Sequence, residues 1–218
     1  MNKKWLVVSA AAAIAVVFVA GTLVFRDRSK QEVAQAVRTN NEALVRAHSP
    51  VYGNPAAKVT IVEFFDPSCE ACRAFYPIVK GIVNASFSQV RLVVRYAPLH
   101  RGSDRAVKIL EAARQQGKYW EALEKTLETQ PQWAAHDNPN PELIWELIAD
   151  TGLDLAKAKS AADSPEVDRV LKQDVADMKA LKVERTPGFF VNGTPLVDFG
   201  VPQLKALVEQ ELRKPKAL

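Results

Sequence analysis

Cysteine, methionine and histidine are scarce in this chain: among 218 residues there are two Cys, two Met and three His. Two cysteines exclude a fold that is held together by a framework of disulfides. A closed zinc site needs four ligands, and His48, His100 and His136 are too scattered to complete one with the cysteines. Met1 and Met178 form no methionine-rich tract. The sequence therefore predicts neither a bound metal nor a cofactor.

Charge of one sign is also lacking. The 29 Lys and Arg residues stand against 25 Asp and Glu residues, which gives a formal net charge of +4, and the two signs are interleaved along the chain. This pattern is typical of a solvated surface and predicts no nucleic-acid partner. With 48% hydrophobic residues, the chain is long enough to bury one core that carries a helical insertion.

The two cysteines that are present, Cys69 and Cys72, form a C-x-x-C motif after an apolar stretch and at the start of a helical pattern. This spacing on a first helical turn brings both sulfurs within bonding distance, and the N-terminal end of a helix favours a thiolate on the first. The motif therefore favours reversible dithiol–disulfide chemistry. Half of a zinc site and an incidental pair are the alternatives.

An uncharged segment, residues 5–25, lies between Lys4 and Arg26. As a helix its 21 residues would span about 31 Å, enough to cross the hydrocarbon core of a bilayer. A cleavable signal peptide is the alternative, but the apolar part of such a peptide is usually only about 7–15 residues long. The best cleavage position available is Val19-Ala20-Gly21. We therefore expect residues 1–25 to be a transmembrane anchor or uncleaved signal that leaves the rest of the chain outside the cytoplasm.

Residues 26–50 are predicted to form a helical spacer. Five residues at alternating four- and three-residue spacing would form a narrow seam along one side of this helix: Val33, Val37, Asn40, Leu44 and Ala47. Asn and Ala weaken so short a seam as a coiled coil. The favoured interpretation is therefore a helix that packs on its own domain or lifts it off the membrane. Weak self-association through residues 33–47 is the alternative.

The rest of the chain is predicted to contain strands at both ends and helices between them. After a turn-like segment at 50–58, strands are expected at 59–65 and 90–96 around a helix at 69–86. Two more strands are expected at 188–191 and 194–197, on either side of the hairpin signal Asn192-Gly193. Only helical periodicity is found from 99 to 181, with a Pro- and Asn-rich break at 130–140. The other predicted helices are 106–116, 119–129, 141–151, 155–162, 165–181 and 202–213.

This order, β-α-β followed by helices and then β-β-α, is similar to the thioredoxin fold with a helical insertion. Three further features match at the family's offsets: Glu63 lies six residues before Cys69, Pro77 lies five after Cys72, and Thr186-Pro187 directly precedes the hairpin. Over residues 50–213 the chain resembles the DsbA-like thiol–disulfide oxidoreductases of the bacterial cell envelope. The resemblance implies an α/β thioredoxin fold made of residues 51–98 and 182–218, with residues 99–181 as an all-helical insertion domain.

The resemblance also implies a role for each matching residue. Cys69 is expected to be the exposed sulfur that is attacked, and Cys72 to be the buried resolving thiol. A buried carboxyl such as Glu63 has a raised pKa and can exchange a proton with Cys72, although a strand-end Glu that faces solvent is the alternative. Thr186 and a cis Pro187 are expected to bind the backbone of an extended substrate.

Two positions depart from the pattern of DsbA. Glu70-Ala71 stands between the cysteines in place of Pro-His, and Thr186 precedes the proline in place of Val. Glu70 puts a negative charge beside Cys69 and Ala71 supplies no positive one, so we expect a higher Cys69 pKa and a less oxidising disulfide than in relatives with Pro-His. Disulfide formation is the favoured reaction. Disulfide reduction or isomerisation, and Cu(I) binding as in copper-resistance relatives, are the alternatives.

The implied partners are unfolded or cysteine-containing envelope proteins and a DsbB-like or DsbD-like membrane redox protein. The implied location is the bacterial inner membrane, crossed once by residues 5–25, with the catalytic domain in the periplasm. His100 follows the second predicted strand and could contact the site. A lone histidine at a strand end is, however, more often a surface or structural residue.

Overall fold

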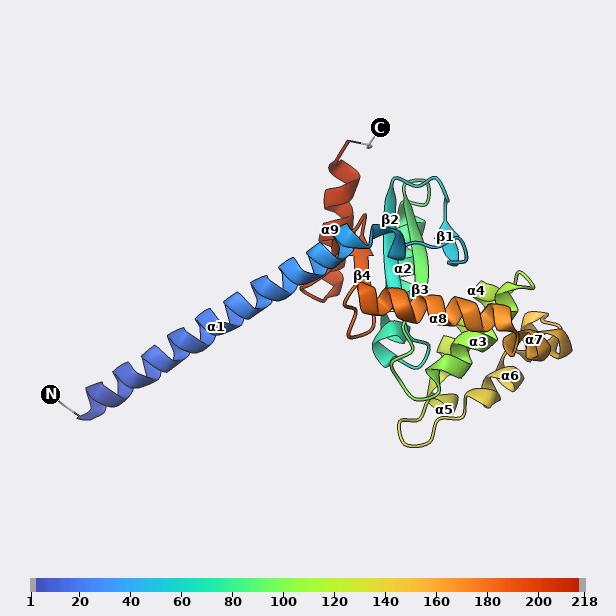
Figure 1. Cartoon of the computed structure of the whole chain (residues 1–218), viewed down its shortest axis with the longest axis horizontal. Coiled ribbons are helices and arrows are strands. Elements are labelled where there is room, and N and C mark those ends of the chain that lie inside the picture. Colours follow the sequence, from blue (N-terminus) through green and yellow to red (C-terminus); the bar gives the residue numbers. More distant parts are fainter. Residues whose placement is uncertain (1–2, 216–218) are drawn as a thin grey trace.

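The computed structural model describes the backbone of residues 3–215, and the side chains in this range except those of residues 3–12, Arg26 and Ser29. A five-stranded sheet in the order β1-β3-β2-β4-β5 forms the centre of the fold. Helices cover both faces of the sheet, and helix α1 extends away from the rest of the chain as a long arm (Figure 1).

The central strands are β2 (Val59–Phe65) and β3 (Val90–Tyr96), which pair in parallel along their whole length. On the other side of β2 lies β4 (Gly188–Val191), which runs antiparallel to it, and β5 (Thr194–Pro195) follows at the sheet edge. The predicted bounds of β2, β3 and β4 are confirmed, whereas β5 is shorter than predicted. Apolar or aromatic side chains at five of the seven positions of each strand explain why β2 and β3 are buried on both faces.

The predicted hairpin turn between β4 and β5 is confirmed. Asn192 and Gly193 have φ values of 45° and 83°, the left-handed conformation that both central residues of a type I′ turn adopt. The Asn192 side chain also accepts a hydrogen bond of 2.9 Å from the backbone N–H of Thr60. The turn is thereby attached to the start of β2.

A short edge strand, β1 (Val51–Gly53), was not predicted; it pairs antiparallel with β3. Its neighbour Pro50 and its own Gly53 indicate a turn in the sequence. Gly53 has a φ of 100°, and a Cβ atom there would lie 2.9 Å from the Val83 side chain. The glycine is therefore required by the close approach of α2 to the strand, a packing reason that sequence alone does not show.

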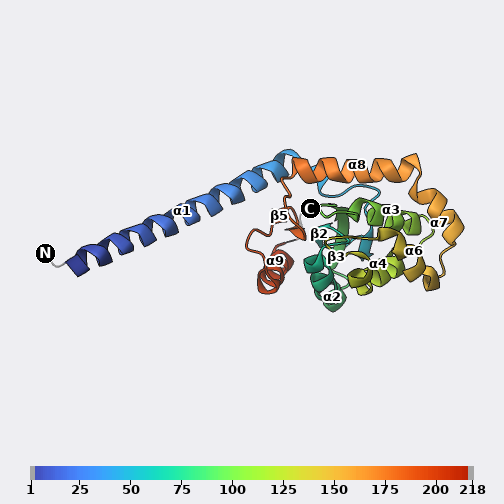
Figure 2. The same cartoon turned by 90° about the horizontal axis from the view of Figure 1, so that it is seen from below.

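The two faces of the sheet are covered by different helices. Helices α2 (Glu70–Ala85) and α9 (Val201–Arg213) pack on the face that carries Ile61 and Phe65. Helix α8 (Pro165–Ala180) and the end of α1 (Lys3–Thr39) pack on the opposite face, which carries Val62 and Phe64. Figure 2 shows α8 and α1 on one side of the sheet and α2 and α9 on the other.

The segment between β3 and β4 is helical, as predicted. Its helices are α3 (Ser103–Arg114), α4 (Tyr119–Glu128), α5 (Gln130–Trp133), α6 (Ile144–Leu147), α7 (Leu155–Ala162) and α8. The single helix predicted at 141–151 is wrong, because α6 is flanked by 3₁₀ turns that begin at Pro141 and end at Thr151, before Gly152 at φ 78°. The predicted break at 130–140 is partly wrong, since α5 forms there around the fully buried Trp133.

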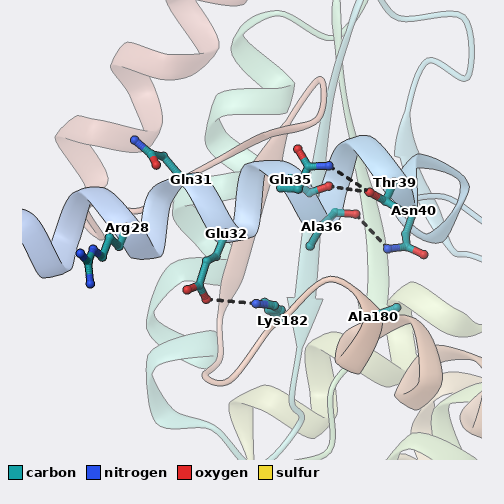
Figure 3. A pocket seen from close by; sticks show the side chains of 9 residues that line it. All are labelled: Arg28, Gln31, Glu32, Gln35, Ala36, Thr39, Asn40, Ala180 and Lys182. Carbon is teal, nitrogen blue, oxygen red and sulfur yellow. Dashed lines mark hydrogen bonds and ion pairs between the residues drawn. The ribbon is translucent and has the colours of Figure 1, made fainter.

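The first part of the predicted spacer helix, residues 26–39, is the last part of α1, and it packs on its own domain as favoured. The prediction that the helix continues to residue 50 is wrong, because α1 ends at Thr39 and a 3₁₀ turn (Asn41–Ala43) follows. Val37 and Leu44 are buried in the same apolar cluster as Phe64 of β2. Two ion pairs fasten the helix, Lys30 to Asp198 at 3.2 Å and Glu32 to Lys182 at 3.0 Å. Figure 3 shows the second pair beside an open hollow of about 530 Å³, which none of the predicted site residues lines. Self-association through residues 33–47 stays a prediction.

Residues 13–25 of α1 are exposed and largely apolar. Large apolar side chains from Ile14 to Phe25 have exposed fractions of 53–74%. In the part of the chain that the structure describes, no helix is both long and apolar enough to cross a membrane. The predicted span, residues 5–25, includes residues 5–12, whose side chains lie outside the described part.

A buried ionic cluster joins three parts of the fold. Arg95 of β3 is fully buried and donates hydrogen bonds to Asp174 (2.7 Å) and Asp177 (2.6 Å) of α8. Arg46, from the segment after α1, forms a bidentate pair with Asp177 at 2.8 and 2.7 Å. Asp174 also accepts from the backbone N–H of Tyr96 at 2.8 Å. The cluster therefore connects β3, α8 and the segment that follows α1.

Candidate active site

Cys69 and Cys72 lie at the N-terminal end of α2. Cys69 is the N-cap, with an extended backbone (φ −74°, ψ 120°), and Cys72 belongs to the first helical turn. Both are free thiols. Cys72 is fully buried, and Cys69 retains an exposed fraction of only 6%. The expectation of an exposed Cys69 is therefore wrong, because the carbonyl oxygen of Thr186 lies 3.3 Å from its sulfur.

The pKa of Cys69 is lowered to about 5. The main cause is a hydrogen bond from the Cys72 thiol; burial opposes it, and the backbone N–H groups of Ala71 and Cys72 lower the pKa further. Glu70 is not among the causes that shift this pKa, so the effect expected for Glu70-Ala71 in place of Pro-His stays a prediction.

The pKa of Cys72 is raised well above its ordinary value. Burial is the main cause, followed by the hydrogen bond to Cys69 and the negative charge of Glu63. The backbone N–H of Asp66 donates to the Cys72 sulfur at 3.5 Å, which opposes the rise. The pKa values of the two thiols therefore differ widely. At neutral pH Cys69 is a thiolate, whereas Cys72 keeps its proton.

Glu63 is buried in the middle of the sheet. It lies on β2, with Val94 of β3 and Phe189 of β4 beside it, and its exposed fraction is 1%. The alternative of a solvent-facing Glu is therefore wrong. Its Oε1 atom has no hydrogen-bond partner among the described residues. Burial, and then the charge of Cys69, raise the pKa of Glu63 to about 8, so at neutral pH this carboxyl is protonated next to the buried thiol.

The Thr186–Pro187 peptide bond is cis, as the resemblance implies. It directly precedes β4 and brings the Thr186 carbonyl to the Cys69 sulfur. The hydroxyl oxygen of Thr186 is buried and has no hydrogen-bond partner among the described residues. The chain segment predicted to bind substrate therefore lies against the predicted nucleophile.

Asp66 is a residue of the site that the sequence analysis missed. It is fully buried and receives hydrogen bonds from the backbone N–H groups of Ser68 (2.8 Å), Leu99 (2.7 Å) and His100 (2.9 Å), and from the Ser103 hydroxyl. It thereby ties the turn before Cys69 to the segment that follows β3. An aspartate that interrupts an apolar strand end three residues before the motif was the available signal.

His100, which the sequence left open, belongs to this site. Its Nδ1 atom lies 2.7 Å from the Asp66 carboxylate. Burial lowers the pKa of His100, but the hydrogen bond to Asp66 and the negative charges of Asp66, Cys69 and Glu70 raise it by more. The interaction of two charges is mutual, so a protonated His100 stabilises the Cys69 thiolate.

Gln130 is a second missed residue. It is the first residue of α5 and is 2% exposed, and its side-chain amide donates hydrogen bonds to the carbonyl oxygens of Pro67 (2.7 Å) and Cys69 (3.1 Å). The predicted break at 130–140 placed this residue in a loop, and no sequence pattern linked it to the motif. The structure therefore connects the helical segment directly to the active-site turn.

The two residues between the cysteines differ in exposure. Glu70 is exposed, and its carboxylate lies 3.6 Å from the ring of His136, which is also exposed. Ala71 is partly buried against the apolar core. Both positions adjoin the thiols as predicted, but the charge of Glu70 has a histidine neighbour that the sequence did not indicate.

An aromatic group lies next to the cis-proline segment. The ring of Phe75 on α2 is 5.7 Å from that of Phe189 on β4 and 4.6 Å from that of Phe199, which precedes α9. Phe189 is buried, whereas Phe199 is 45% exposed. Within the described residues, no group of three or more His, Cys, Asp or Glu side chains is placed to hold a metal ion.

Comparison with known proteins gives the same fold. The family model described as Thioredoxin matches residues 46–210. The crystal structure of a thioredoxin-like oxidoreductase from Silicibacter pomeroyi DSS-3 has a TM-score of 0.69 and 32% sequence identity, and the match covers 81% of this chain and 99% of that one. Disulfide bond formation protein D of Bacillus subtilis is 27% identical over 75% of this chain and 77% of its own length.

A different group of relatives consists of much longer proteins. The Na(+)/H(+) antiporter NhaA 3 of Salinispora tropica is 32% identical over 66% of this chain, but the match covers 21% of the antiporter. The chain spans about a fifth of the length of these relatives. The family model, in contrast, covers the sheet, the site and the helical segment together. The chain therefore belongs to the thioredoxin family.

Proposed function

We propose that this chain is a thiol–disulfide oxidoreductase that exchanges a Cys69–Cys72 disulfide with protein thiols, most favourably toward disulfide formation. The observation that carries the proposal is the contrast between the two thiols: the pKa of Cys69 is about 5 and that of Cys72 is far higher. Cys72 is fully buried and Cys69 retains an exposed fraction of 6%, so a substrate thiolate reaches the Cys69 sulfur. The low pKa of Cys69 then makes it the better leaving group when the mixed disulfide is resolved. The names of relatives such as disulfide bond formation protein D support the same reaction.

In the proposed reaction, a substrate thiolate attacks the Cys69 sulfur of the oxidised protein. The Cys69–Cys72 bond breaks, and Cys72 leaves with the electron pair and takes up the proton of Glu63, whose pKa of about 8 keeps it protonated at neutral pH. A second substrate thiolate attacks the substrate sulfur of the mixed disulfide, and Cys69 leaves as a thiolate. The substrate dithiol is oxidised to a disulfide, the protein is reduced to a dithiol, and Glu63 regains a proton from solvent.

Binding of an extended substrate is supported by the cis-proline segment and the aromatic group beside it. The backbone of Thr186 lies next to Cys69, where it can pair with a substrate strand. Phe199 exposes an aromatic ring in contact with Phe75. An unfolded, cysteine-containing protein offers both an extended backbone and apolar side chains, so it suits this surface.

The proposal also concerns the direction of electron flow, that is, whether the protein oxidises or reduces its substrates. Stabilising the thiolate of the reduced form makes a disulfide more oxidising. A Cys69 pKa lowered to about 5 therefore supports an oxidising disulfide. We therefore place disulfide formation first and isomerisation or reduction second, with a DsbB-like or a DsbD-like redox partner respectively.

For location, we propose that residues 5–25 attach the domain to the bacterial inner membrane, with the site on the periplasmic side. The uncharged segment and the exposed apolar side chains from Ile14 to Phe25 support this. Carbonate extraction tests it: the full chain is expected in the membrane pellet. A soluble form that begins near Gly21 or Thr22 would instead establish cleavage.

The reaction is tested by trapping. Cys72→Ala removes the resolving thiol, so mixed disulfides with substrate proteins are expected to accumulate on Cys69 and to appear on non-reducing gels. Cys69→Ala is the matched control and is expected to give none. Adducts on Cys69→Ala alone would reverse the two roles. Stoichiometric Cu(I) binding by a wild-type protein that turns over no disulfide would favour the metal-binding alternative.

A further inference from the structure

The turn that carries Cys69 is held from outside by one buried side chain. Gln130 donates from its single amide nitrogen to two carbonyl oxygens, those of Pro67 and Cys69, at 2.7 and 3.1 Å. The amide therefore holds two peptide groups of the turn, the one between Pro67 and Ser68 and the one between Cys69 and Glu70. Gln130 comes from α5, more than sixty residues further along the chain.

The Cys69 carbonyl oxygen accepts hydrogen bonds from two different helices. Besides the one from Gln130, it accepts the first hydrogen bond of α2, from the backbone N–H of Arg73 at 3.1 Å. The peptide plane after Cys69 is therefore held by two donors, one from α2 and one from α5. This peptide plane begins α2, and the backbone N–H groups of Ala71 and Cys72 in the first turn of α2 stabilise the Cys69 thiolate, as the first N–H groups of a helix do for an anion.

The Gln130 side chain is poorly suited to a purely structural role. Its Oε1 atom is buried and has no hydrogen-bond partner among the described residues, which costs free energy that an apolar side chain of the same size would not cost. Only the two N–H donors offset this cost, and both are directed at the active-site turn. An unsatisfied buried acceptor next to a reacting group is the pattern expected where position matters more than stability.

We propose that Gln130 is a positioning residue of the active site, whose amide holds residues 67–69 so that the Cys69 sulfur lies against the first N–H groups of α2. The inference rests on the proposed function, since it takes Cys69 as the sulfur that is attacked. It also assigns the helical segment a part in the chemistry: through α5 this segment sets how well the Cys69 thiolate is stabilised.

The test is the thiol–disulfide equilibrium of the full chain with glutathione. Gln130→Met keeps the length of the side chain and removes both donors. We expect the equilibrium constant to shift toward the disulfide by about tenfold, which corresponds to about 30 mV for a two-electron couple, together with a raised Cys69 pKa in a thiolate-absorbance titration. Gln132→Met, at an exposed neighbour on the same short helix, is the matched control and is expected to match the wild type.

A merely structural role would give a different result. It would lower the thermal midpoints of the oxidised and reduced forms equally and leave the equilibrium with glutathione unchanged, because only a difference between the two forms moves that equilibrium. Gln130→Glu has nearly the same shape and replaces the donors by oxygen, so it is expected to shift the equilibrium in the same direction as Gln130→Met. Equal destabilisation of both forms in these variants, or failure of both to fold, would overturn the positioning role. A wild-type protein that does not exchange with glutathione would instead overturn the proposed function.

Discussion

Both faces of the central sheet contain buried ionisable side chains, but these side chains differ in whether they have ionic or hydrogen-bond partners. On the face covered by α8, Arg95 and Asp174 are fully buried, and each of the two is ion-paired and hydrogen-bonded. On the face covered by α2, Glu63 is 1% exposed and one of its carboxyl oxygens has no partner among the described residues. The groups lie on neighbouring strands, since Glu63 is opposite Val94, next to Arg95.

This difference separates a structural cluster from a functional group. Paired charges can remain ionised inside a protein, so the Arg95 cluster keeps one charge state and connects elements. An unpaired carboxyl avoids the cost of a buried charge by keeping its proton, and the pKa of Glu63 rises to about 8. A proton held near neutral pH beside a thiol can be exchanged with it. Both groups are buried, so the presence or absence of ionic and hydrogen-bond partners is what distinguishes the structural cluster from the functional carboxyl.

The largest effect is expected from breaking the paired cluster. Asp174→Ala leaves Arg95 with part of its charge unpaired in the interior, and we expect a loss of about 3–5 kcal/mol in the free energy of unfolding. The reduction potential is expected to stay unchanged, since the cluster lies on the other face of the sheet. Urea unfolding checks the first point, with Asp168→Ala, an exposed ion-pair residue on the same helix, as a control that should change stability little.

Replacing the unpaired carboxyl is expected to have the opposite effect on stability. The folded pKa of Glu63 lies above its unfolded value, so the stability that its protonation contributes is complete below pH 4.5 and is lost as the pH rises to about 8. Relative to wild type in the same redox form, Glu63→Gln should therefore gain on the order of 4 kcal/mol between these pH values. A difference in unfolding free energy that stays constant with pH would contradict the raised pKa.

A smaller, electrostatic effect is expected from His100. His100→Asn removes a positive charge that interacts with the Cys69 thiolate, so the Cys69 pKa should rise, and the thiolate fraction near pH 5 should fall. At neutral pH and above the two proteins should not differ, because Cys69 is ionised in both. His136→Asn is the control, since His136 is exposed and pairs with Glu70. Equal thiolate titrations of wild type and His100→Asn would remove His100 from the site.

The smallest effect is expected at Glu70. Its side chain is 69% exposed, so solvent and salt weaken its repulsion of the Cys69 thiolate. Glu70→Gln should lower the Cys69 pKa by only a few tenths of a unit, and less at high salt. Replacing Glu70-Ala71 by Pro-His should lower it further and raise the potential. A large, salt-independent change for Glu70→Gln would show that this charge is less screened than its exposure implies.

The strands and the motif could be predicted from sequence because they depend on local patterns. Apolar runs predicted the first and last residues of β2 and β3, and Asn192-Gly193 predicted the hairpin between β4 and β5. The resemblance placed Glu63 and Thr186-Pro187 at the cysteines. These features lie within short stretches whose chemistry indicates their structure.

The missed residues all depend on tertiary contacts. Asp66 and His100 are more than thirty residues apart in sequence and meet only because β2 and β3 end side by side. Gln130 reaches the motif from a four-residue helix inside a predicted loop. Gly53 was taken for a turn signal, although its role is to let α2 approach β1. None of these contacts has a local signature.

The central claim is that one motif holds a stabilised thiolate next to a thiol that keeps its proton. A thiolate-absorbance titration of the reduced wild-type protein, combined with alkylation mapping at each step, tests it most directly. We expect one thiol to ionise near pH 5, mapped to Cys69, and the second to ionise well above pH 9, mapped to Cys72. A single step near pH 9 for both thiols, or first ionisation of Cys72, would contradict the account.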